Sequence, residues 1–467
     1  MITISEIHDR ILSGESTARA EVEAAFERAE QASGYHALLS LTKERAYERA
    51  DEIDLRIKNG EDAGPLAGVP FVVKDNYLAF GAPTTAASRI LEDFMAPLQA
   101  TVVEKLERAG AICIGKSNLD AFAHGGSTEN SAFGVTNNAH DMTKVAGGSS
   151  GGSAVVTALS VVPFALGTDT GGSIRQPASF NGIYGYKPTY GMASRYGVVA
   201  MASSTDTMGC FANTAADTEQ VMGLMAGKDS KDHTTLDNYF APLTNAPVAL
   251  KIGLINDSMT EDVDPEVRAR TNEYVERLRA AGHAVDMVDL PMSKYALAMY
   301  YIIVPAEVTS NLARYDGVRY GLRANGVKTL SELYGLSRDQ GFMPENKRRI
   351  MIGSYVLSSG FYDAYFQQAS KARTLLINEY NKLFSEYDVL LSPTAPTPAF
   401  GIGENVDDPI KMYLADIMTV PPSLAGLPAI NVPAGMNAQG LPIGVQLIAA
   451  AKKDALLFAL AKQMEEN

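Results

Sequence analysis

The sequence predicts an α/β fold in which helices are layered on a β-sheet. Two segments, residues 101–114 and 264–288, each have the pattern of a helix that ends at Ala-Gly and is followed by an apolar strand. Such alternation of helices with strands is typical of sheets covered by helices. With 467 residues and 46% hydrophobic content, the chain can bury a large core, although length alone leaves open one large domain or two to three smaller ones.

The first 60 residues are expected to be helical. Ser16 and Thr17 are alternative helix caps, and the charged residues 44–49 have the composition of a solvated helix face. After a Gly-Pro turn, the apolar residues 69–73 predict a buried strand that ends at Lys74. A lysine is thereby expected at the end of a buried strand.

The two helix-strand segments have clear boundaries. Residues 101–109 have helical spacing and stop at Gly110, before the apolar strand 111–114. In the second segment Asp264 is expected to cap a helix with Pro265 in its first turn, which Gly282 ends before a strand resumes. That second strand is predicted at residues 284–288.

The rest of the chain divides into a helical stretch and a return to strands. Residues 291–385 have a mainly helical pattern, which suggests an insertion that covers the sheet. Strand-like runs, separated by proline and glycine turns, then return and are expected to rejoin the main sheet. These runs are residues 388–391, 429–432 and 443–448.

Two turns rich in glycine and serine are the most informative part of the chain. They are residues 147–153 (GGSSGGS) and 169–173 (DTGGS), with a short helix expected at 153–160 and a buried strand at 161–166 between them. Glycine lets the backbone turn tightly and approach a ligand, and successive N–H groups in such a turn hold negative charge. The alternative is that both turns are flexible loops, because segments rich in glycine and serine are usually flexible. If the two turns form an active site, they would bring Ser149 and Ser173 together.

Several nucleotide-binding motifs are excluded at these turns. Neither turn has the lysine of a Walker A motif, and no G-x-G-x-x-G lies between a strand and a helix. What remains is nucleophilic serine chemistry, and since no histidine is obviously paired with these serines, a lysine is expected as the base.

Composition limits the binding partners and the cellular location that can be expected for the protein. The 40 Lys and Arg against 54 Asp and Glu give a net charge of −14, which is poorly suited to holding phosphate backbones without a partner. Two cysteines, Cys113 and Cys210, form no disulfide framework, and Cys113 is expected to pack as a small hydrophobe. No signal core and no membrane-length apolar run is found, so a cytoplasmic protein without membrane contact is expected. The six histidines include no H-x-x-x-H pair, and no metal site is expected.

The arrangement of Lys74 at a strand end, Ser149 in GGSSGGS and Ser173 in DTGGSIRQPA resembles the amidase signature family. Further motifs are similar to one branch of it, the glutaminase subunits of tRNA-dependent amidotransferases. These motifs are STENSAFG at 127–134, KPTYG at 187–191, SRYG at 194–197, RRI at 348–350 and LSSGFYDAY at 357–365. The likeness covers roughly residues 60 to 450.

The resemblance implies a single amidase domain over residues 1–467, built on a large mixed sheet with helices on both faces. In this division, residues 1–60 are N-terminal helices, residues 61–290 and 386–450 form the core that carries the signature, and residues 291–385 are a mainly helical insertion that covers the pocket. Some positions depart from the family pattern without removing a catalytic group. They are Ala146 and Cys210 in place of proline, Ala121 in place of glutamate, Asn181 in place of cysteine, and a short C-terminus.

By resemblance, Ser173 is the nucleophile, and Ser149 relays its proton to Lys74. Such a base requires the pKa of the lysine to fall from ~10.4 towards neutrality, which burial produces. Chemistry alone leaves Ser150 and Ser153 as alternatives to Ser149, and only the motif selects Ser149. For an arbitrary lysine in this position, the ordinary alternative is a surface ion pair with Asp75.

The second turn supplies the expected oxyanion donors. These are the backbone N–H groups of Thr170, Gly171, Gly172 and Ser173, which no bulky side chain blocks at either glycine. Asp169 and Arg175 are instead expected to form an ion pair that fixes the loop.

The resemblance also implies L-glutamine as the substrate. Arg349 would bind its α-carboxylate, Asp416 its α-ammonium, and Tyr300 would lie near the side-chain amide. Judged without the family, these residues have simpler interpretations. Those are a helix-end arginine, an acid at a helix N-terminus and a packed core tyrosine.

The implied partners are a tRNA-binding B subunit and a small C subunit. The B subunit would use ATP and Mg²⁺ to activate charged tRNA, Glu-tRNA(Gln) or Asp-tRNA(Asn), and the ammonia released here would give Gln-tRNA(Gln). This chain itself would bind no cofactor. Two other functions stay open: a stand-alone amidase that hydrolyses small or aryl amides, and a scaffold without turnover.

Overall fold

Eleven strands form a single sheet in the computed structural model, which describes residues 1–466. Their order across the sheet is β1-β3-β2-β4-β6-β5-β10-β11-β9-β7-β8. The strands are β1 (Leu38–Leu41), β2 (Pro70–Lys74), β3 (Ile112–Ser117), β4 (Phe164–Asp169), β5 (Tyr184–Lys187), β6 (Thr207–Ala212), β7 (Lys251–Ile255), β8 (Ala284–Val288), β9 (Val389–Pro393), β10 (Ala429–Met436) and β11 (Pro442–Ala449).

The sheet is mixed, as expected. Strand β2 pairs in parallel with β3 and β4, and β7 pairs in parallel with β8 and β9. The pairs that join these two groups, from β4 through β6, β5, β10 and β11 to β9, are antiparallel. The runs predicted at 388–391, 429–432 and 443–448 therefore do rejoin the main sheet.

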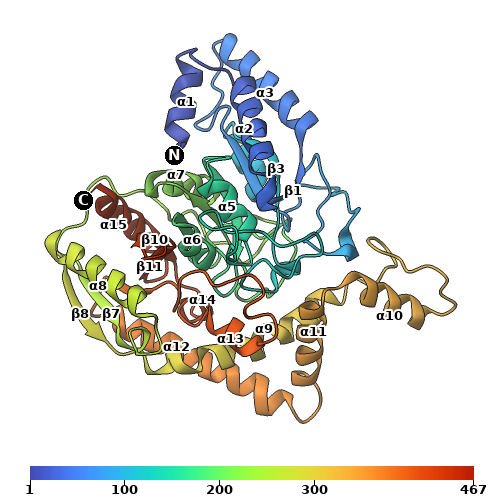
Figure 1. Cartoon of the computed structure of the whole chain (residues 1–467), viewed down its shortest axis with the longest axis vertical. Helices are drawn as coiled ribbons and strands as arrows, with labels where there is room; N and C mark the ends of the chain where they lie inside the picture. The colour runs from blue at the N-terminus through green and yellow to red at the C-terminus, as the bar shows by residue number, and fades with distance from the viewer. Residues whose placement is uncertain (467) are drawn as a thin grey trace.

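The α-helices that surround the sheet alternate with its strands along the chain (Figure 1). They are α1 (Ile4–Leu12), α2 (Ala18–Gln31), α3 (Lys43–Lys58), α4 (Thr101–Arg108), α5 (Gly151–Ala158), α6 (Arg175–Asn181), α7 (Ala215–Met225), α8 (Pro265–Ala280), α9 (Ala296–Leu312), α10 (Leu330–Gly341), α11 (Pro344–Val356), α12 (Gln368–Leu383), α13 (Pro409–Leu414), α14 (Val420–Leu424) and α15 (Asp454–Glu466).

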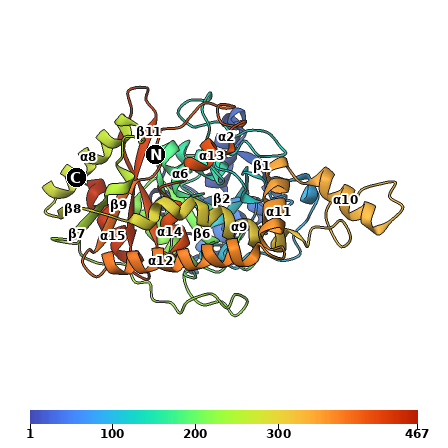
Figure 2. The ribbon, with the colours of Figure 1, turned by 90° about the horizontal axis from the view of Figure 1, so that it is seen from below.

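Helices cover both faces of the sheet because successive strand residues point to opposite sides. Leu390 of β9 packs into the apolar cluster formed with α9, α12 and α14. Its neighbours Val389 and Leu391 pack into the main cluster, which includes residues of α8 and α15. Figure 2 shows α9 and α12 running side by side on one side of the molecule.

Several helix ends follow the predicted signals. Asp264 caps α8 by accepting hydrogen bonds from the N–H groups of Glu266 and Val267, and Pro265 is the first residue of the helix. Of the two alternatives at the start of α2, Thr17 is the cap. The helix predicted at 101–109 is α4, and Gly110 follows it with a φ of +96°, a conformation that favours glycine.

Two predictions of secondary structure were wrong in part. The first 60 residues are not all helical, because β1 adds to the edge of the sheet beside β3. The strand predicted at 161–166 begins only at Phe164, and the helix predicted at 153–160 is α5, which begins and ends two residues earlier. Ser160 adopts a φ of +55°, so the chain turns there before the strand starts.

Residues 291–385 are mainly helical, as predicted, and comprise α9 to α12 with a π-helical turn at Tyr362–Gln367. Helix α9 packs against both α11 and α12. Helix α10 extends away from the body of the molecule in both ribbon views (Figures 1 and 2).

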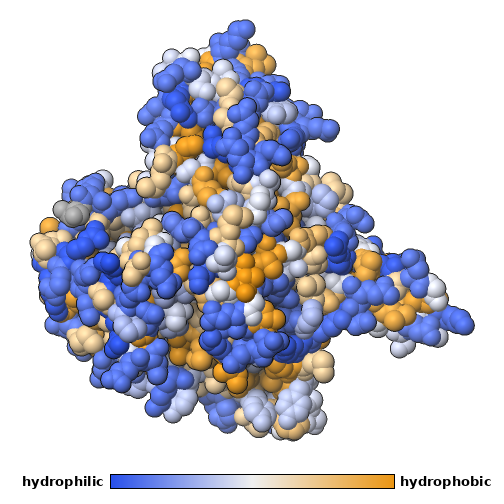
Figure 3. All heavy atoms as spheres, in the orientation of Figure 1, coloured by the Kyte–Doolittle hydropathy of each residue, from blue (hydrophilic) through white to orange (hydrophobic). Residues whose placement is uncertain are grey.

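The outer surface is largely hydrophilic on the face shown in Figure 3, with apolar side chains gathered towards its middle. Among residues 1–466, no helix has the length and apolar character to cross a membrane. Cys113 and Cys210 are both buried and unpaired, so the prediction that Cys113 packs as a small hydrophobe is confirmed.

Candidate active site

The site lies at one edge of the sheet, where two parallel strands end. Strands β2 and β4 are neighbours, and they finish at Lys74 and Asp169. Parallel strands carry their carboxyl ends to the same edge, where α/β proteins commonly bind ligands. The topology thereby brings Lys74 next to the turn that follows β4.

Lys74 is fully buried and contacts a serine. Its Nζ lies 2.8 Å from Ser149 Oγ and 2.9 Å from Thr168 Oγ1, and the side chain is 0% exposed. The alternative of a surface ion pair with Asp75 is excluded, because Asp75 pairs instead with Lys116 at 2.8 Å.

Two opposing effects set the protonation of Lys74. Burial removes the water that stabilises an ammonium group, while Asp120, Asp169 and Asp206 favour the charged form. Burial dominates and lowers the pKa of Lys74 to about 7. Near neutral pH a substantial fraction of this amine is unprotonated and can accept a proton.

The two serine-bearing turns lie against each other. The Ser150 N–H donates to the Ser173 carbonyl oxygen at 3.2 Å, and the peptide bond between Gly148 and Ser149 is cis. Ser149 is fully buried, whereas Ser173 retains 8% exposure. The hydroxyl that Lys74 contacts is thus fully enclosed, and Ser173, which is expected to attack, keeps a small exposed fraction.

The alternative serines have other partners. Ser150 Oγ donates to the Thr168 carbonyl at 3.2 Å, and Ser153 Oγ donates to the Leu166 carbonyl at 2.8 Å. Both hydroxyls therefore tie α5 to β4, and neither contacts Lys74.

The turn at 170–173 offers backbone donors. The N–H groups of Thr170, Gly171 and Ser173 have no hydrogen-bond acceptor within residues 1–466. The Gly172 N–H, in contrast, donates to Asp169 Oδ1 at 2.8 Å and is used inside the loop. Of the four donors expected from the sequence, three are therefore unpaired within the described residues.

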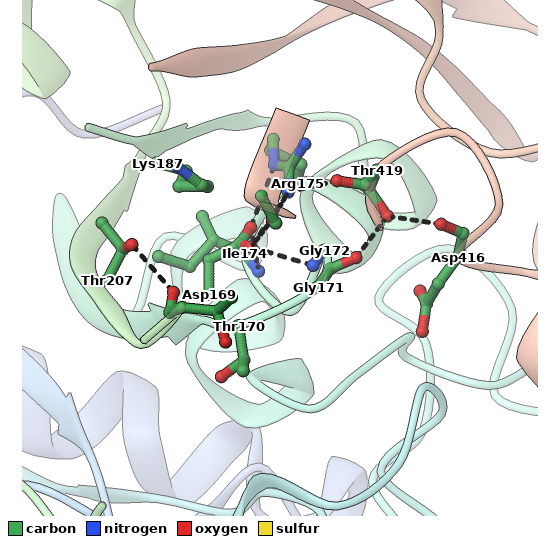
Figure 4. A network of polar contacts seen from close by, with 12 residues as sticks. Asp169, Thr170, Gly171, Gly172, Ile174, Arg175, Lys187, Thr207, Asp416 and Thr419 are labelled. Carbon is green, nitrogen blue, oxygen red and sulfur yellow. Dashed lines mark hydrogen bonds and ion pairs between the residues drawn. The ribbon is translucent and has the colours of Figure 1, made fainter. Parts of the chain in front are cut away.

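The expected ion pair between Asp169 and Arg175 is confirmed. The guanidinium donates through Nε to Oδ2 at 3.0 Å and through Nη2 to Oδ1 at 2.9 Å, with both side chains fully buried. Arg175 also donates to the Thr419 carbonyl at 2.9 Å and to Ser423 Oγ at 2.7 Å. Figure 4 shows this network joining the turn to Thr419, the residue that precedes α14.

The turn is also held from its outer sides. Thr419 Oγ1 donates to the Gly171 carbonyl at 2.7 Å, and Thr170 Oγ1 donates to Asp206 Oδ1 at 2.8 Å. Asp206 in turn accepts from the N–H groups of Met201 and Ala202. The backbone donors are thereby fixed before any ligand arrives, which is what stabilisation of a developing oxyanion requires.

A cavity of about 300 Å³ lies beside these turns, and its lining does not include Lys74, Ser149 or Ser173. Its lining residues reach the turns, because Asp120 lies against Gly148 and Asp416 against Gly172. Arg349 and Asp416 both line it, together with Asp120, the aromatic rings of Tyr301 and Tyr413, and His124. The volume suits a small polar molecule. A larger cleft of about 820 Å³ lies on the other side of segment 405–418, and its lining includes none of Lys74, Ser149 and Ser173.

Arg349 is held from one side only. Its Nε donates to Glu345 Oε1 at 2.8 Å, and the rings of Tyr301 and Tyr413 lie 5.3 and 5.8 Å from the guanidinium carbon. The two terminal nitrogens have no hydrogen-bond partner among the described residues. These two nitrogens therefore form a planar pair of donors that can bind a carboxylate.

Asp416 reaches the same cavity from the loop after α13. A Cβ atom added to Gly126 or to Gly172 would lie 3.4 or 3.3 Å from its carboxylate oxygens, so the group lies between the loop at Gly126 and the turn at residues 169–173. Its Oδ1 is buried and has no hydrogen-bond partner within residues 1–466. Burial, assisted by the charge of Asp169, raises the pKa of Asp416 to about 8.

Tyr300 lies near the turn but not on the cavity wall. A Cβ atom added to Gly171 would meet its ring at 2.7 Å, so the tyrosine packs directly on the turn. The adjacent Tyr301 lines the cavity and stacks on Tyr413, with ring centres 3.8 Å apart. Sequence reasoning named Tyr300 and missed Tyr301, because only the helix orientation separates these neighbours.

Two of the departures from the family pattern are in contact. The Asn181 Nδ2 donates to the Ala146 carbonyl at 2.7 Å, immediately before the glycine turn. Cys210 is buried in β6, and Ala121 is buried and makes its hydrogen bonds through its backbone. None of the four contacts the Lys74 amine. Within residues 1–466, no group of three or more His, Cys, Asp or Glu side chains could hold a metal ion.

Comparisons with known proteins match nearly the whole chain. The family model for amidases matches residues 20–458. The A subunit of glutamyl-tRNA(Gln) amidotransferase from Thermosynechococcus vestitus is 47% identical over 472 residues, which covers 100% of this chain and 98% of the relative. The protein of that name from Nostoc punctiforme is also 47% identical, over 474 residues and the same shares of both chains.

Solved structures share the fold. The crystal structure of the glutamyl-tRNA(Gln) amidotransferase A subunit from Thermotoga maritima has a TM-score of 0.82 and 38% identity, covering 100% of this chain and 94% of that one. A bacterial aryl acylamidase of the amidase signature family has a TM-score of 0.87 at 25% identity, covering 100% and 96%.

Proposed function

The chain belongs to the amidase family, and we propose that it is the glutaminase subunit of a tRNA-dependent amidotransferase. The observation that carries the chemistry is the buried contact of 2.8 Å between Lys74 Nζ and Ser149 Oγ, beside the turn that presents Ser173. The names of its close relatives supply the rest of the proposal.

In the first half of the reaction, Ser173 Oγ attacks the side-chain amide carbon of glutamine. Its proton passes to Ser149 Oγ as the Ser149 proton passes to the neutral Lys74 amine. Negative charge develops on the amide oxygen, and the N–H groups of Thr170, Gly171 and Ser173 stabilise it. The Gly172 N–H is left out of this donor set because Asp169 accepts it.

Collapse of this intermediate breaks the carbon–nitrogen bond. The lysine returns its proton through Ser149 to the leaving nitrogen, and ammonia departs from a glutamyl ester on Ser173. In the second half, water attacks the ester while the same relay takes a water proton and then gives one to Ser173 Oγ. Glutamate leaves, and both serines and the lysine regain their starting protonation states.

Glutamine recognition is assigned to the adjoining cavity. Arg349 would bind the α-carboxylate through its two free terminal nitrogens, and Asp416 would bind the α-ammonium through Oδ1. Tyr300 would close one side of the scissile amide from its position on Gly171. Since Arg349 belongs to the helical residues 291–385, this placement supports that segment as the cover of the pocket.

The complex would divide its work among subunits. In this proposal a tRNA-binding B subunit holds the charged tRNA, binds ATP and Mg²⁺, and uses the ammonia to convert Glu-tRNA(Gln) to Gln-tRNA(Gln) in the cytoplasm. A small C subunit braces the pair. The net charge of −14 supports the placement of tRNA on a partner and not on this chain.

Acylation of Ser173 is the test of this function. In the complex supplied with glutamine, a glutamyl adduct should appear on the wild-type chain by intact-mass spectrometry after acid quenching. Ser173→Ala should form no adduct, because the other hydroxyl of the turn, Thr170 Oγ1, is held by Asp206. An adduct on a folded Ser173→Ala chain would refute the assignment of the nucleophile.

A further inference from the structure

His124 is a fully buried side chain on the wall of the cavity that contains Arg349 and Asp416. One of its ring nitrogens, Nδ1, is hydrogen-bonded to Asn346 Nδ2. The other, Nε2, is buried and has no hydrogen-bond partner within residues 1–466. Buried polar atoms are nearly always paired, so this nitrogen calls for an explanation.

The surroundings of Asn346 fix which ring nitrogen carries the hydrogen. Its Oδ1 accepts from the Met343 N–H at 3.2 Å, and its Nδ2 donates to the Ala121 carbonyl at 2.8 Å. An amide nitrogen only donates, so the second Nδ2 hydrogen goes to His124 Nδ1, which acts as the acceptor. In a neutral imidazole the remaining hydrogen is then on Nε2.

The ring is neutral for two reasons. Burial and the positive charge of Arg349 hold the pKa of His124 well below its usual range. His124 therefore presents a single N–H donor without an acceptor, close to a guanidinium that also has unused donors. The unpaired donors of His124 and Arg349 lie beside one cavity, and they fit a ligand group made of acceptor oxygens.

We propose that His124 Nε2–H donates a hydrogen bond to the α-carboxylate of the bound substrate, as a second donor beside Arg349. This inference rests on the proposed glutaminase function and adds a specificity residue to it. The α-ammonium is excluded as the partner because it has no lone pair to accept a hydrogen bond, whereas Asp416 can accept from it.

Helix α11 positions both donors. Asn346 and Arg349 are three residues apart, so they lie on one face of the helix. Arg349 reaches the cavity directly, while Asn346 orients the imidazole. A single helix thereby sets the spacing of two donors around one carboxylate.

The test uses the complex with its partner subunits and compares three versions of this chain. His124→Leu removes the donor at similar volume, and His124→Gln restores an N–H at about the same reach. Glutamine KM should rise roughly 10-fold in His124→Leu with little change in kcat, and His124→Gln should recover most of the loss, because a hydrogen bond to a charged group is worth about 10- to 100-fold.

A substrate analogue separates recognition from folding. Glutaminamide carries a neutral α-carboxamide in place of the α-carboxylate, so its KM should change far less than that of glutamine in His124→Leu. His283→Leu is the matched control: this histidine is also buried, but it bonds the Leu250 N–H and lies outside the cavity. Its glutamine KM should stay at the wild-type value.

Two outcomes would overturn the inference. An unchanged glutamine KM in His124→Leu would show that the donor is not used, and an equal rise for glutamine and glutaminamide would show a structural role. Both leave the proposed function intact, because the wild-type chain still turns over glutamine. Absence of a glutamyl adduct on the wild-type Ser173 would instead overturn the function itself.

Discussion

Lys74 and Asp416 make the pH dependence of the reaction a test of individual residues. Lys74 must be neutral to take a proton, so kcat should rise as pH increases through about 7. Asp416 must be ionised to bind an ammonium group, so in the free enzyme kcat/KM should rise further through about 8. Bound glutamine stabilises the Asp416 carboxylate, and kcat should therefore report Lys74 alone.

Steady-state pH profiles of kcat and kcat/KM for glutamate formation by the complex would check both ionisations. Asp416→Asn should remove the upper ionisation from kcat/KM and leave the kcat profile in place. A kcat that does not change across neutral pH, with the chemical step rate-limiting, would mean that Lys74 is not the base.

Arg349 provides a second test of an individual residue. Arg349→Ala should lower kcat/KM for glutamine by roughly 10- to 100-fold, the value of a lost charge-assisted contact. A small neutral amide should be hydrolysed nearly as before, because the guanidinium recognises the carboxylate and not the scissile bond. Lys347→Ala removes a positive charge two residues away on the same helix, outside the cavity, and should affect neither substrate. Equal damage to both substrates would indicate a structural fault.

The residues predicted from the sequence were those marked by local pattern. Lys74 follows an apolar strand, and Ser149 and Ser173 lie in glycine turns, so local pattern and the family motif marked all three as candidates. His124 and Asn346 are 222 positions apart and Thr168 lies inside a strand, so no local signal marked them. The motif selected Ser149, but the contact of its hydroxyl with Lys74 and the bond from the Gly172 N–H to Asp169 are distances that only the folded chain provides.

At the scale of elements, the turn after β4 is fixed by contacts from several directions. The Asp169–Arg175 pair lies behind it, Thr419 holds the Gly171 carbonyl, and Asp206 holds the Thr170 hydroxyl. Such preorganisation matters because a misplacement of about 1 Å can cost ~100-fold in rate. The turn is therefore expected to act as a unit.

Thr170→Val tests this fixation. The substitution keeps the side-chain shape and removes only the hydroxyl that bonds Asp206. We expect kcat to fall roughly 10-fold with little change in KM, since a hydrogen bond to a charged group is worth about this much. Thr170→Ser, which retains the hydroxyl, should keep most of the activity. If kcat is unchanged in Thr170→Val, the Asp206 contact does not position the donors.

The order of elements was largely predictable, but their pairing was not. The caps of α8 and the alternation of helices with strands are local signals, and the structure follows them. Strand β1 was missed because its four residues are held by pairing with β3, more than 70 positions away. The start of β4 was predicted too early. The apolar residues begin at Val161, but the chain turns at Ser160 and the strand starts only at Phe164.

At the scale of the whole molecule, the question is how hydrolysis is restrained. A glutaminase that feeds ammonia to a second site would waste glutamine if it ran at full rate alone. The oxyanion turn is held by Thr419 and Asp206, which lie outside it, so a partner that shifts these supporting residues could change its activity. We therefore expect low turnover in the isolated chain.

The most direct measurement is glutamate production at saturating glutamine, with the Ser173→Ala chain as the blank. The isolated chain should be slow, the rate should rise on assembly with the tRNA-binding subunit, and it should rise again with ATP and charged tRNA. Full activity in the isolated chain, unchanged by any of these additions, would contradict the coupled-subunit account and identify the protein as a stand-alone amidase.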